Sequence, residues 1–527
     1  MTSLIQPPGR PGAPAAGTGD EAAIAAGGAG AAGGAGGVTV PTGVVVEPAT
    51  RTRRTGSHDP SPRRGLLRSL APTAVPYAWP LWALFVFYPV WWLLGLGTFI
   101  YPIVAVPMAI YLLRHRPIKV PPGFGIWLMF LVWFCASVIM LRVNPPGTFG
   151  NSGNLRLAVV ALRLVLYLSV TVMLLYVGNL TERQLPRTTL VRWLSVGFIV
   201  TVAGGFLGML WPNFGFASPV ELVLPQSISS NNYVQSLVHP NSAQVQAVLG
   251  DPAPRPAAPY GYTNVWGENL SLLLIWFVVA WWVYGSGLRR LAAIGIIGLS
   301  MVPTIYSLNR GMWIAIGLTI VYVAARLAAR GRLWVVGGLS VGLTVAGLVF
   351  LLSPLHTIFE ERLNHGHSNR IREFTTEKVV EVSRQSPIIG FGNTRNAVGS
   401  AQSVAVGRTA QCQECGNPAL GSNGQVWMVL ISQGYVGLAL YTLFFVYGIV
   451  RYWRDITPIG LSGVLILLLS LLYNVYYDAL VTPLGFFMLA YALLWRNDIE
   501  HARVARRVKL RPRHRRFMAR SAATRPA

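Results

Sequence analysis

Two arginines beside apolar segments are the residues best suited to binding an anion. Arg310 lies in SLNRGMW, in a short turn between two apolar segments, and Arg255 lies in RPAAPYGYTN, ahead of another. A guanidinium group presents a planar fork of N–H donors that matches the oxygens of a phosphate or pyrophosphate. An arginine at a membrane surface can also simply extend toward lipid phosphates. Both interpretations stay open at this point.

Two acidic residues lie at the ends of apolar segments. Glu268 begins the segment ENLSLLLIWF, and Asp478 lies in NVYYDALV, between the last two apolar segments. Ionisable groups at membrane depth are costly, so they are candidates for a functional role. For Glu268, a cap or a loop hydrogen bond is the alternative.

A polar stretch from about 353 to 424 interrupts the apolar chain. It contains His365, His367 and Arg370 within HGHSNR, which either bind substrate or form a solvated surface. No HExxH motif is present, which argues against a zinc protease, and we predict no metal site. Cys412 and Cys415 form a CxxC without a second ligand pair nearby, so outside the cytoplasm we expect a local disulfide.

The composition indicates a membrane protein. Of 527 residues, 53% are hydrophobic and 12% are charged, whereas soluble domains carry roughly 25% charged residues. The net charge of +25 resides largely in the tails and in short loops. Attraction to anionic lipid and the positive-inside rule explain this placement better than nucleic-acid binding. The sequence has no nucleotide-binding glycine motif, and we expect no cofactor.

The predicted fold is an all-α polytopic membrane protein with about 12 transmembrane helices and a large, partly helical extracytoplasmic loop. Residues 1–75 are expected to be a disordered cytoplasmic tail rich in Gly, Ala and Arg, 76–497 the membrane domain, and 498–527 a basic cytoplasmic tail. The predicted spans are 78–95, 97–113, 123–141, 158–178, 189–210, 268–285, 291–308, 312–328, 333–352, 425–448, 459–476 and 480–496. Basic residues on alternate loops then place both termini in the cytoplasm and the loops 211–267 and 353–424 outside.

Four stretches in this order resemble the O-antigen ligase and polymerase superfamily, which are polytopic membrane glycosyltransferases. They are RPAAPYGYTN, SLNRG, HGHSNRIREF with SPIIGFGN, and SNGQVWMVLISQGYVGLALYTLFF. The resemblance covers about residues 78 to 496. It implies glycosyl transfer from a polyprenyl-pyrophosphate-linked glycan to a glycan or lipid acceptor, at the outer face of the plasma membrane and without a metal. The resemblance further implies that Arg255 and Arg310 bind the pyrophosphate and that Arg370 assists them.

One position departs from this family. Ser422 stands before Asn423 where the family's ligases have a histidine, and a serine of ordinary acidity is no general base near neutral pH. The candidate bases are therefore Glu268, Asp478, His365 and His367. Ligase and polymerase both stay open, and the missing histidine favours a polymerase.

Two other function classes stay open. A transporter or flippase for a lipid-linked or anionic substrate suits the number of spans. A non-catalytic scaffold that binds other glycan-assembly proteins suits the absence of the ligase histidine.

Overall fold

The computed structural model describes residues 76–148, 153–229, 232–246, 253–352, 356–357, 360, 367–396 and 419–523. The chain divides into two compact units, Met1–Arg63 and Arg64–Ala527, and all described residues belong to the second. The predicted disordered tail, His365 and the CxxC of Cys412 and Cys415 lie outside the described residues.

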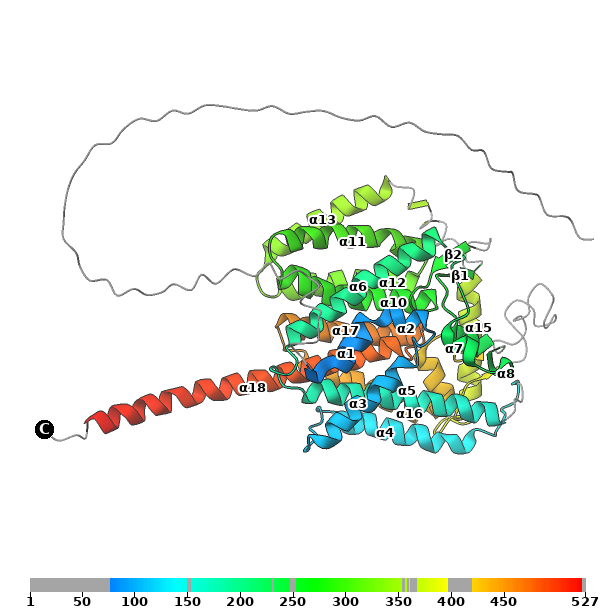
Figure 1. Ribbon diagram of the computed structural model, residues 1–527, viewed down its shortest axis with the longest axis horizontal. Helices are drawn as coiled ribbons and strands as arrows, with labels where there is room; N and C mark the ends of the chain where they lie inside the picture. The colour runs from blue at the N-terminus through cyan, green and yellow to red at the C-terminus, as the bar shows by residue number, and fades with distance from the viewer. Residues whose placement is uncertain are drawn as a thin grey trace, which may run out of the picture. The chain divides into compact units, whose positions relative to one another are not determined.

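The described part is built almost entirely from α-helices (Figure 1). The long helices are α3 (Ile100–Arg114), α4 (Phe124–Ser137), α5 (Gly153–Asn179), α6 (Arg187–Leu210), α10 (Thr263–Phe277), α11 (Leu288–Tyr306), α12 (Arg310–Ala328), α13 (Leu333–Leu351), α15 (His367–Ser383), α16 (Gln425–Tyr452), α17 (Pro458–Tyr476) and α18 (Thr482–Ala523). The short helices are α1 (Trp79–Val86), α2 (Tyr88–Leu93), α7 (Pro219–Val223), α8 (Gln226–Ser229) and α9 (Asn232–Val238).

Two small antiparallel strand pairs complete the described structure. Strand β1 (Ala243–Gln246) pairs with β2 (Ala253–Pro256), and β3 (Arg395–Asn396) pairs with β4 (Ala419–Leu420). The pair β1–β2, the short helices α7 and α8, and α15 lie at the same end of the long helices (Figure 1). Segments from both predicted outer loops therefore gather at one end of the helix bundle.

Seven described helices are long and apolar enough to cross a membrane, which is consistent with a multi-pass membrane protein. They are Arg156–Asn179, Arg187–Leu210, Thr263–Val283, Leu288–Tyr306, Arg310–Ala328, Gln425–Tyr452 and Pro458–Tyr476. Three shorter apolar helices occur at Ile100–Arg114, Phe124–Met140 and Val336–Val345.

The predicted span 78–95 is not one helix. It contains α1 and α2, which meet at Phe87. Pro89 occupies the first turn of α2, where its missing N–H costs nothing, whereas in a helix continuing from α1 it would leave the Phe85 carbonyl without a donor and clash with it. The break therefore follows from the local sequence YPV.

The core lies where α10, α16, α17 and α18 meet their neighbours. Helix α10 packs on α6, α16 packs on α4 and α17, and α18 packs on α5 and α17. Nearly every side chain of α10 and of the segment 484–495 in α18 is buried, so these helices lie inside the bundle.

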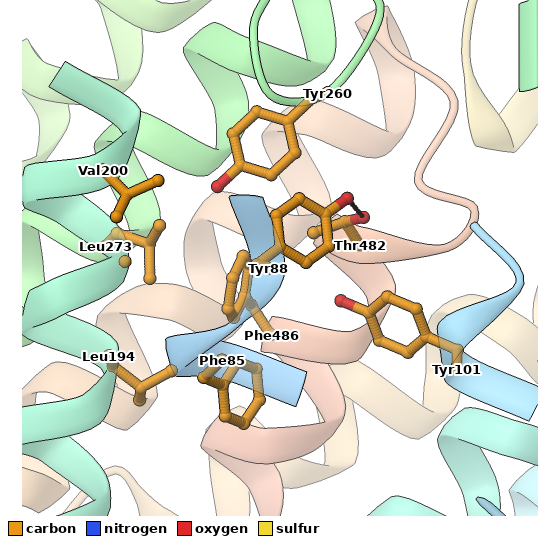
Figure 2. A pocket seen from close by; sticks show the side chains of 10 residues that line it. Phe85, Tyr88, Tyr101, Leu194, Val200, Tyr260, Leu273, Thr482 and Phe486 are labelled. Carbon is orange, nitrogen blue, oxygen red and sulfur yellow. Dashed lines mark hydrogen bonds between the residues drawn. The ribbon is translucent and has the colours of Figure 1, made fainter. Parts of the chain in front are cut away.

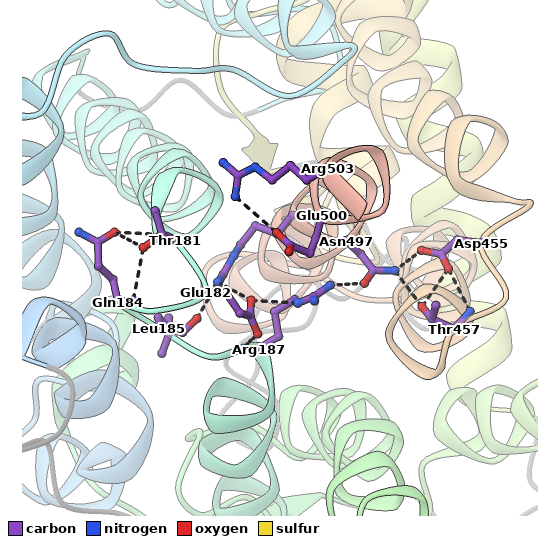
Figure 3. Close-up of polar contacts among 11 residues, drawn as sticks. Thr181, Glu182, Gln184, Leu185, Arg187, Asp455, Thr457, Asn497, Glu500 and Arg503 are labelled. Atoms are coloured by element: carbon purple, nitrogen blue, oxygen red, sulfur yellow. Dashed lines mark hydrogen bonds and ion pairs between the residues drawn. The ribbon is translucent and has the colours of Figure 1, made fainter. Parts of the chain in front are cut away.

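A polar network joins the turns at the other end of the bundle, opposite α15 (Figure 3). Glu182 accepts hydrogen bonds from Nε of Arg187 (3.0 Å) and from Nη2 of Arg496 (3.1 Å). Asn497 accepts from Arg187 and donates to Oγ1 of Thr457 (2.8 Å). These contacts connect the α5–α6 turn, the α16–α17 turn and α18, and they pair the buried arginine Arg496 with a carboxylate.

Candidate functional site

The strand pair β1–β2 brings Arg255 to the turn between α11 and α12. Arg255 lies on β2, its side chain is buried, and its Nε donates to the backbone carbonyl of Ser307 at 2.6 Å. Ser307 follows the last residue of α11. The two sequence segments that carry Arg255 and Arg310 are therefore in direct contact.

The turn that carries Arg310 is tight. Leu308 has a positive φ of 55°. Asn309 then caps α12, because its Oδ1 accepts from the backbone N–H of Met312 at 3.0 Å. Arg310 is the first residue of α12, where the positive end of the helix dipole favours an anion.

Tyr477, from the segment between α17 and α18, packs against this turn. Its hydroxyl donates to Oδ1 of Asn309. Gly311 makes this approach possible, since a Cβ there would lie 2.4 Å from the Tyr477 hydroxyl oxygen and 2.8 Å from Cε2. Burial raises the pKa of Tyr477, against the opposing effect of Arg372 and Arg255, so the hydroxyl remains a donor.

Helix α15 supplies a third arginine. The guanidinium carbon of Arg372 lies 5.5 Å from the ring centre of Tyr477, and its Nη1 donates to the carbonyl of Tyr476 at 2.9 Å. Arg310 lies close enough to interact electrostatically with both Arg372 and Tyr477. We name Arg255, Arg310 and Arg372 the arginine cluster, and Tyr477 lies at its centre.

Glu268 projects from α10 into the interior beside this cluster. Its side chain is fully buried, and neither carboxylate oxygen has a hydrogen-bond partner among the described residues. The same holds for both polar side-chain atoms of Asn269. Glu268 is near enough to Tyr477 and Asp478 to interact electrostatically with both.

Asp478 is the accessible carboxylate of the site. Its side chain is exposed, and its Oδ1 accepts a hydrogen bond from the backbone N–H of Leu480 at 3.0 Å. Protein surrounds it closely enough that desolvation raises its pKa, although the Leu480 N–H and Arg163 oppose this shift. A surface-accessible carboxylate with a raised pKa is suited to accept a proton.

Arg163 adds a cation near Asp478 from within α5. Its Nη1 donates to Oδ1 of Asn393 at 2.6 Å. It lies in a helix that is apolar enough to span a membrane, where arginines are rare. Arg163 was not among the residues predicted for the site. The sequence signal that indicates it is a charged residue inside an apolar segment.

The remaining predicted residues fall into two groups. His367 begins α15 and Arg370 lies one turn further, but the described structure does not extend to their side chains. Ser422 is exposed and donates its Oγ to the carbonyl of Ala419 at 2.7 Å. Its neighbour Asn423 donates to the carbonyl of Arg372 at 3.2 Å, so the SNG segment does contact the helix that carries the cluster.

Tyr477 was not singled out from the sequence, and Arg372 was recognised only as a member of the polar cluster at 365–372, with the pyrophosphate role given to Arg370. Arg372 follows Arg370 by two positions, so only one of the two lies on the face of α15 that meets Tyr477. The phase of an isolated polar helix is not set by a hydrophobic pattern, which explains the omission.

The described side chains offer carboxylates and guanidinium groups rather than a metal site. Among the described residues, no group of three or more His, Cys, Asp or Glu could hold a metal ion. The site presents the three cations of the arginine cluster, a fourth at Arg163, one accessible carboxylate and one buried carboxylate. Such a set can bind a multiply charged anion and accept a proton beside it.

No protein-family model and no curated protein matches this chain.

Proposed function

We propose that this protein transfers a glycosyl group from a polyprenyl-pyrophosphate carrier to an acceptor hydroxyl during assembly of a cell-surface polysaccharide. The observation that carries the proposal is the arginine cluster around Tyr477. Like charges held close together repel one another, and a bound pyrophosphate would offset this cost.

In this proposal the arginine cluster binds the pyrophosphate of the donor. The acceptor oxygen forms a bond to the anomeric carbon while the bond from that carbon to the pyrophosphate oxygen breaks. The electron pair stays on the leaving pyrophosphate, and the guanidinium groups stabilise its growing charge. The N-terminus of α12, which begins at Arg310, acts in the same direction.

Asp478 is the general base of this proposal. It takes the proton of the acceptor hydroxyl as the acceptor oxygen attacks. The attack occurs on the face opposite the leaving group and therefore inverts the anomeric configuration. Asp478 suits this role better than Glu268, since its side chain is exposed whereas that of Glu268 is fully buried. Glu268 instead lies in the interior near Tyr477, and in this proposal it takes no proton from the acceptor.

The topology is part of the same proposal. In this proposal the twelve crossings are the seven candidate spans, the three shorter apolar helices, α1 with α2, and the apolar part of α18. The end that carries Arg289, Arg326 and Arg451 faces the cytoplasm by the positive-inside rule, with both termini on that side of the plasma membrane. The arginine cluster then faces outside, where no nucleotide is needed because the sugar–pyrophosphate bond already stores the energy.

The test is glycan analysis of cells that lack this chain and are complemented with wild type or Arg310→Ala. If the protein is a polymerase, we expect short lipid-linked repeats in the deletion and in Arg310→Ala. If it is a ligase, we expect long unattached chains in both. Unchanged chain length and linkage in Arg310→Ala would contradict the proposal.

Transport is the rival outcome. Purified protein in vesicles that moves a lipid-linked substrate across the bilayer without a covalent change would replace glycosyl transfer by flipping. If single arginine replacements at normal expression leave product formation intact, a scaffold that binds glycan-assembly proteins becomes the better account.

A further inference from the structure

An open cleft lies beside the segment that carries Asp478. One wall is Leu480–Thr482, which begins two residues after Asp478. A second wall is 259–262, which follows Arg255 and leads into α10. The turn after α2 and the end of α9 complete the lining. The cleft is therefore built from the same chain segments as the candidate site.

The cleft is lined by aromatic rings and hydroxyl groups. The rings of Tyr88 and Tyr260 lie 5.3 Å apart, and Trp92 and the 41% exposed Tyr262 line the same cleft. Thr98 and Thr482 add hydroxyls. A sugar ring has apolar C–H faces and a rim of hydroxyl groups, so flat aromatic surfaces with hydrogen-bonding groups between them suit a saccharide.

His239 gives the cleft an oriented hydrogen-bonding group. Its Nδ1 lies 2.8 Å from Oε2 of Glu221. Glu221 is itself fixed by a capping box with Ser218 at the start of α7, in which its backbone N–H donates to Oγ of Ser218 at 3.1 Å. A carboxylate partner makes Nδ1 the donor, so in the neutral imidazole Nε2 is an acceptor for a hydroxyl proton.

Gly95 allows the turn after α2 to pack closely against the residues beside this histidine. It has a φ of 79°, and a Cβ there would lie 2.2 Å from Oγ of Ser218 and 2.6 Å from the carbonyl of Val238. The turn that follows Trp92 is thereby packed directly against the residues that hold Glu221 and His239. The cleft is a preformed arrangement rather than a gap between loops.

A small apolar cavity adjoins the cleft (Figure 2). The two share Tyr88, Tyr260 and Thr482. The hydroxyls of Tyr88 and Thr482 lie 3.3 Å apart, and the Tyr260 hydroxyl lies 2.9 Å from Oγ1 of Thr201. This hydroxyl layer separates a polar cleft from a cavity lined by side chains such as Phe85, Leu194 and Phe486.

We propose that the cleft is a saccharide-binding site that holds the acceptor glycan. Trp92 and Tyr262 stack on the sugar, and Nε2 of His239 accepts a hydrogen bond from one of its hydroxyls. The continuity of the Leu480–Thr482 wall with Asp478 leads the acceptor hydroxyl toward the base. The word acceptor rests on the function proposed above, whereas saccharide binding rests on the cleft alone.

The test uses the full chain in nanodiscs and a defined probe. The probe is the repeat-unit oligosaccharide released by mild acid from the producing cells' own lipid-linked glycan, and its contact with the protein is measured by saturation-transfer NMR and by calorimetric titration. We expect Tyr262→Ala and His239→Ala each to weaken binding about tenfold, the loss of one stacking or hydrogen-bonding contact. The matched controls are Trp211→Ala and His501→Ala, which change exposed side chains outside the cleft. They should bind as wild type does.

The outcomes separate this inference from the proposed function. Oligosaccharide binding that Tyr262→Ala and His239→Ala both leave unchanged, or no binding to the wild type, overturns the cleft assignment even if Arg310 proves essential for transfer. Binding that these variants weaken supports it even if Arg310→Ala cells make normal glycan. Arg310→Ala is expected to bind the oligosaccharide normally, because it changes the pyrophosphate contacts alone.

Discussion

The guanidinium group of Arg372 lies over the ring of Tyr477, 5.5 Å from its centre, and donates a hydrogen bond to the backbone carbonyl of Tyr476. This relationship fixes α15 onto the end of α17. It also places a planar cation beside Arg310. Arg372 is thus both a structural contact and a member of the arginine cluster.

Replacement of Arg372 by lysine should separate these two roles. Lysine keeps the charge but loses the planar fork and the stacking on Tyr477. We expect Arg372→Lys to reduce the transfer rate markedly and Arg372→Ala to reduce it further. Initial rates with a lipid-linked donor measure this effect. An Arg372→Lys variant with the wild-type rate would show that geometry at this position is unimportant. Arg384→Ala, on an exposed arginine after the same helix, is the control.

Gly311→Ala should disturb the site from within α12. The added Cβ would meet the Tyr477 hydroxyl at 2.4 Å, so Tyr477 must move away from Asn309. Overpacking of this kind costs about 1–3 kcal/mol, and the displaced ring should also lower activity. Thermal unfolding in detergent and transfer assays provide the two readouts.

Gly317→Ala is its matched control in the same helix. A Cβ at Gly317 meets nothing within 4 Å. Alanine there should be neutral or stabilise by up to about 1 kcal/mol through helix propensity. Equal effects of the two substitutions would show that the Tyr477 contact does not control the site.

Asp478→Asn should abolish most transfer without unfolding the protein, because loss of a general base typically costs about 10²–10⁴-fold in rate. The wild-type rate should also depend on pH. Desolvation by the surrounding protein raises the pKa of Asp478, and only the deprotonated carboxylate accepts the proton. The rate should therefore fall as the pH drops through this raised pKa and level off above it. A pH–rate profile checks this, and an Asn variant with the same profile as wild type would exclude Asp478 as the base.

Glu268→Gln should retain most of the transfer activity. The buried carboxyl group has no hydrogen-bond partner among the described residues, so a neutral amide of the same shape breaks no hydrogen bond and replaces an ionisable group in an apolar setting. We expect the thermal stability to stay equal or rise. Loss of activity in Glu268→Gln together with normal activity in Asp478→Asn would exchange the roles of the two carboxylates.

The sequence predicted the helices better than the site. Long apolar runs such as 189–210 and 459–476 correspond closely to α6 and α17, because length and composition decide them. The span 78–95 was wrong as a continuous helix, since Pro89 breaks it. The sequence placed the Arg255 segment and the Arg310 turn at the outer ends of apolar helices, and in the structure the two segments are in contact.

The centre of the site depends on tertiary packing. Tyr477 resembles any other aromatic residue in LLYNVYYDAL, and only the approach allowed by Gly311 makes it the neighbour of Asn309. His239 and Glu221 are 18 residues apart in a loop with little hydrophobic pattern, so their contact could not be inferred from spacing.

The most direct measurement is donor cleavage by the purified protein. Full-length protein in nanodiscs is supplied with a polyprenyl-pyrophosphate-linked glycan, and the released polyprenyl pyrophosphate and the new glycosidic bond are quantified together. The proposed function predicts equal amounts of both from wild type and from Arg289→Ala, which changes an exposed arginine in the first turn of α11. It predicts about 10²–10³-fold less of both from Arg310→Ala. Wild-type product formation by Arg310→Ala would contradict it.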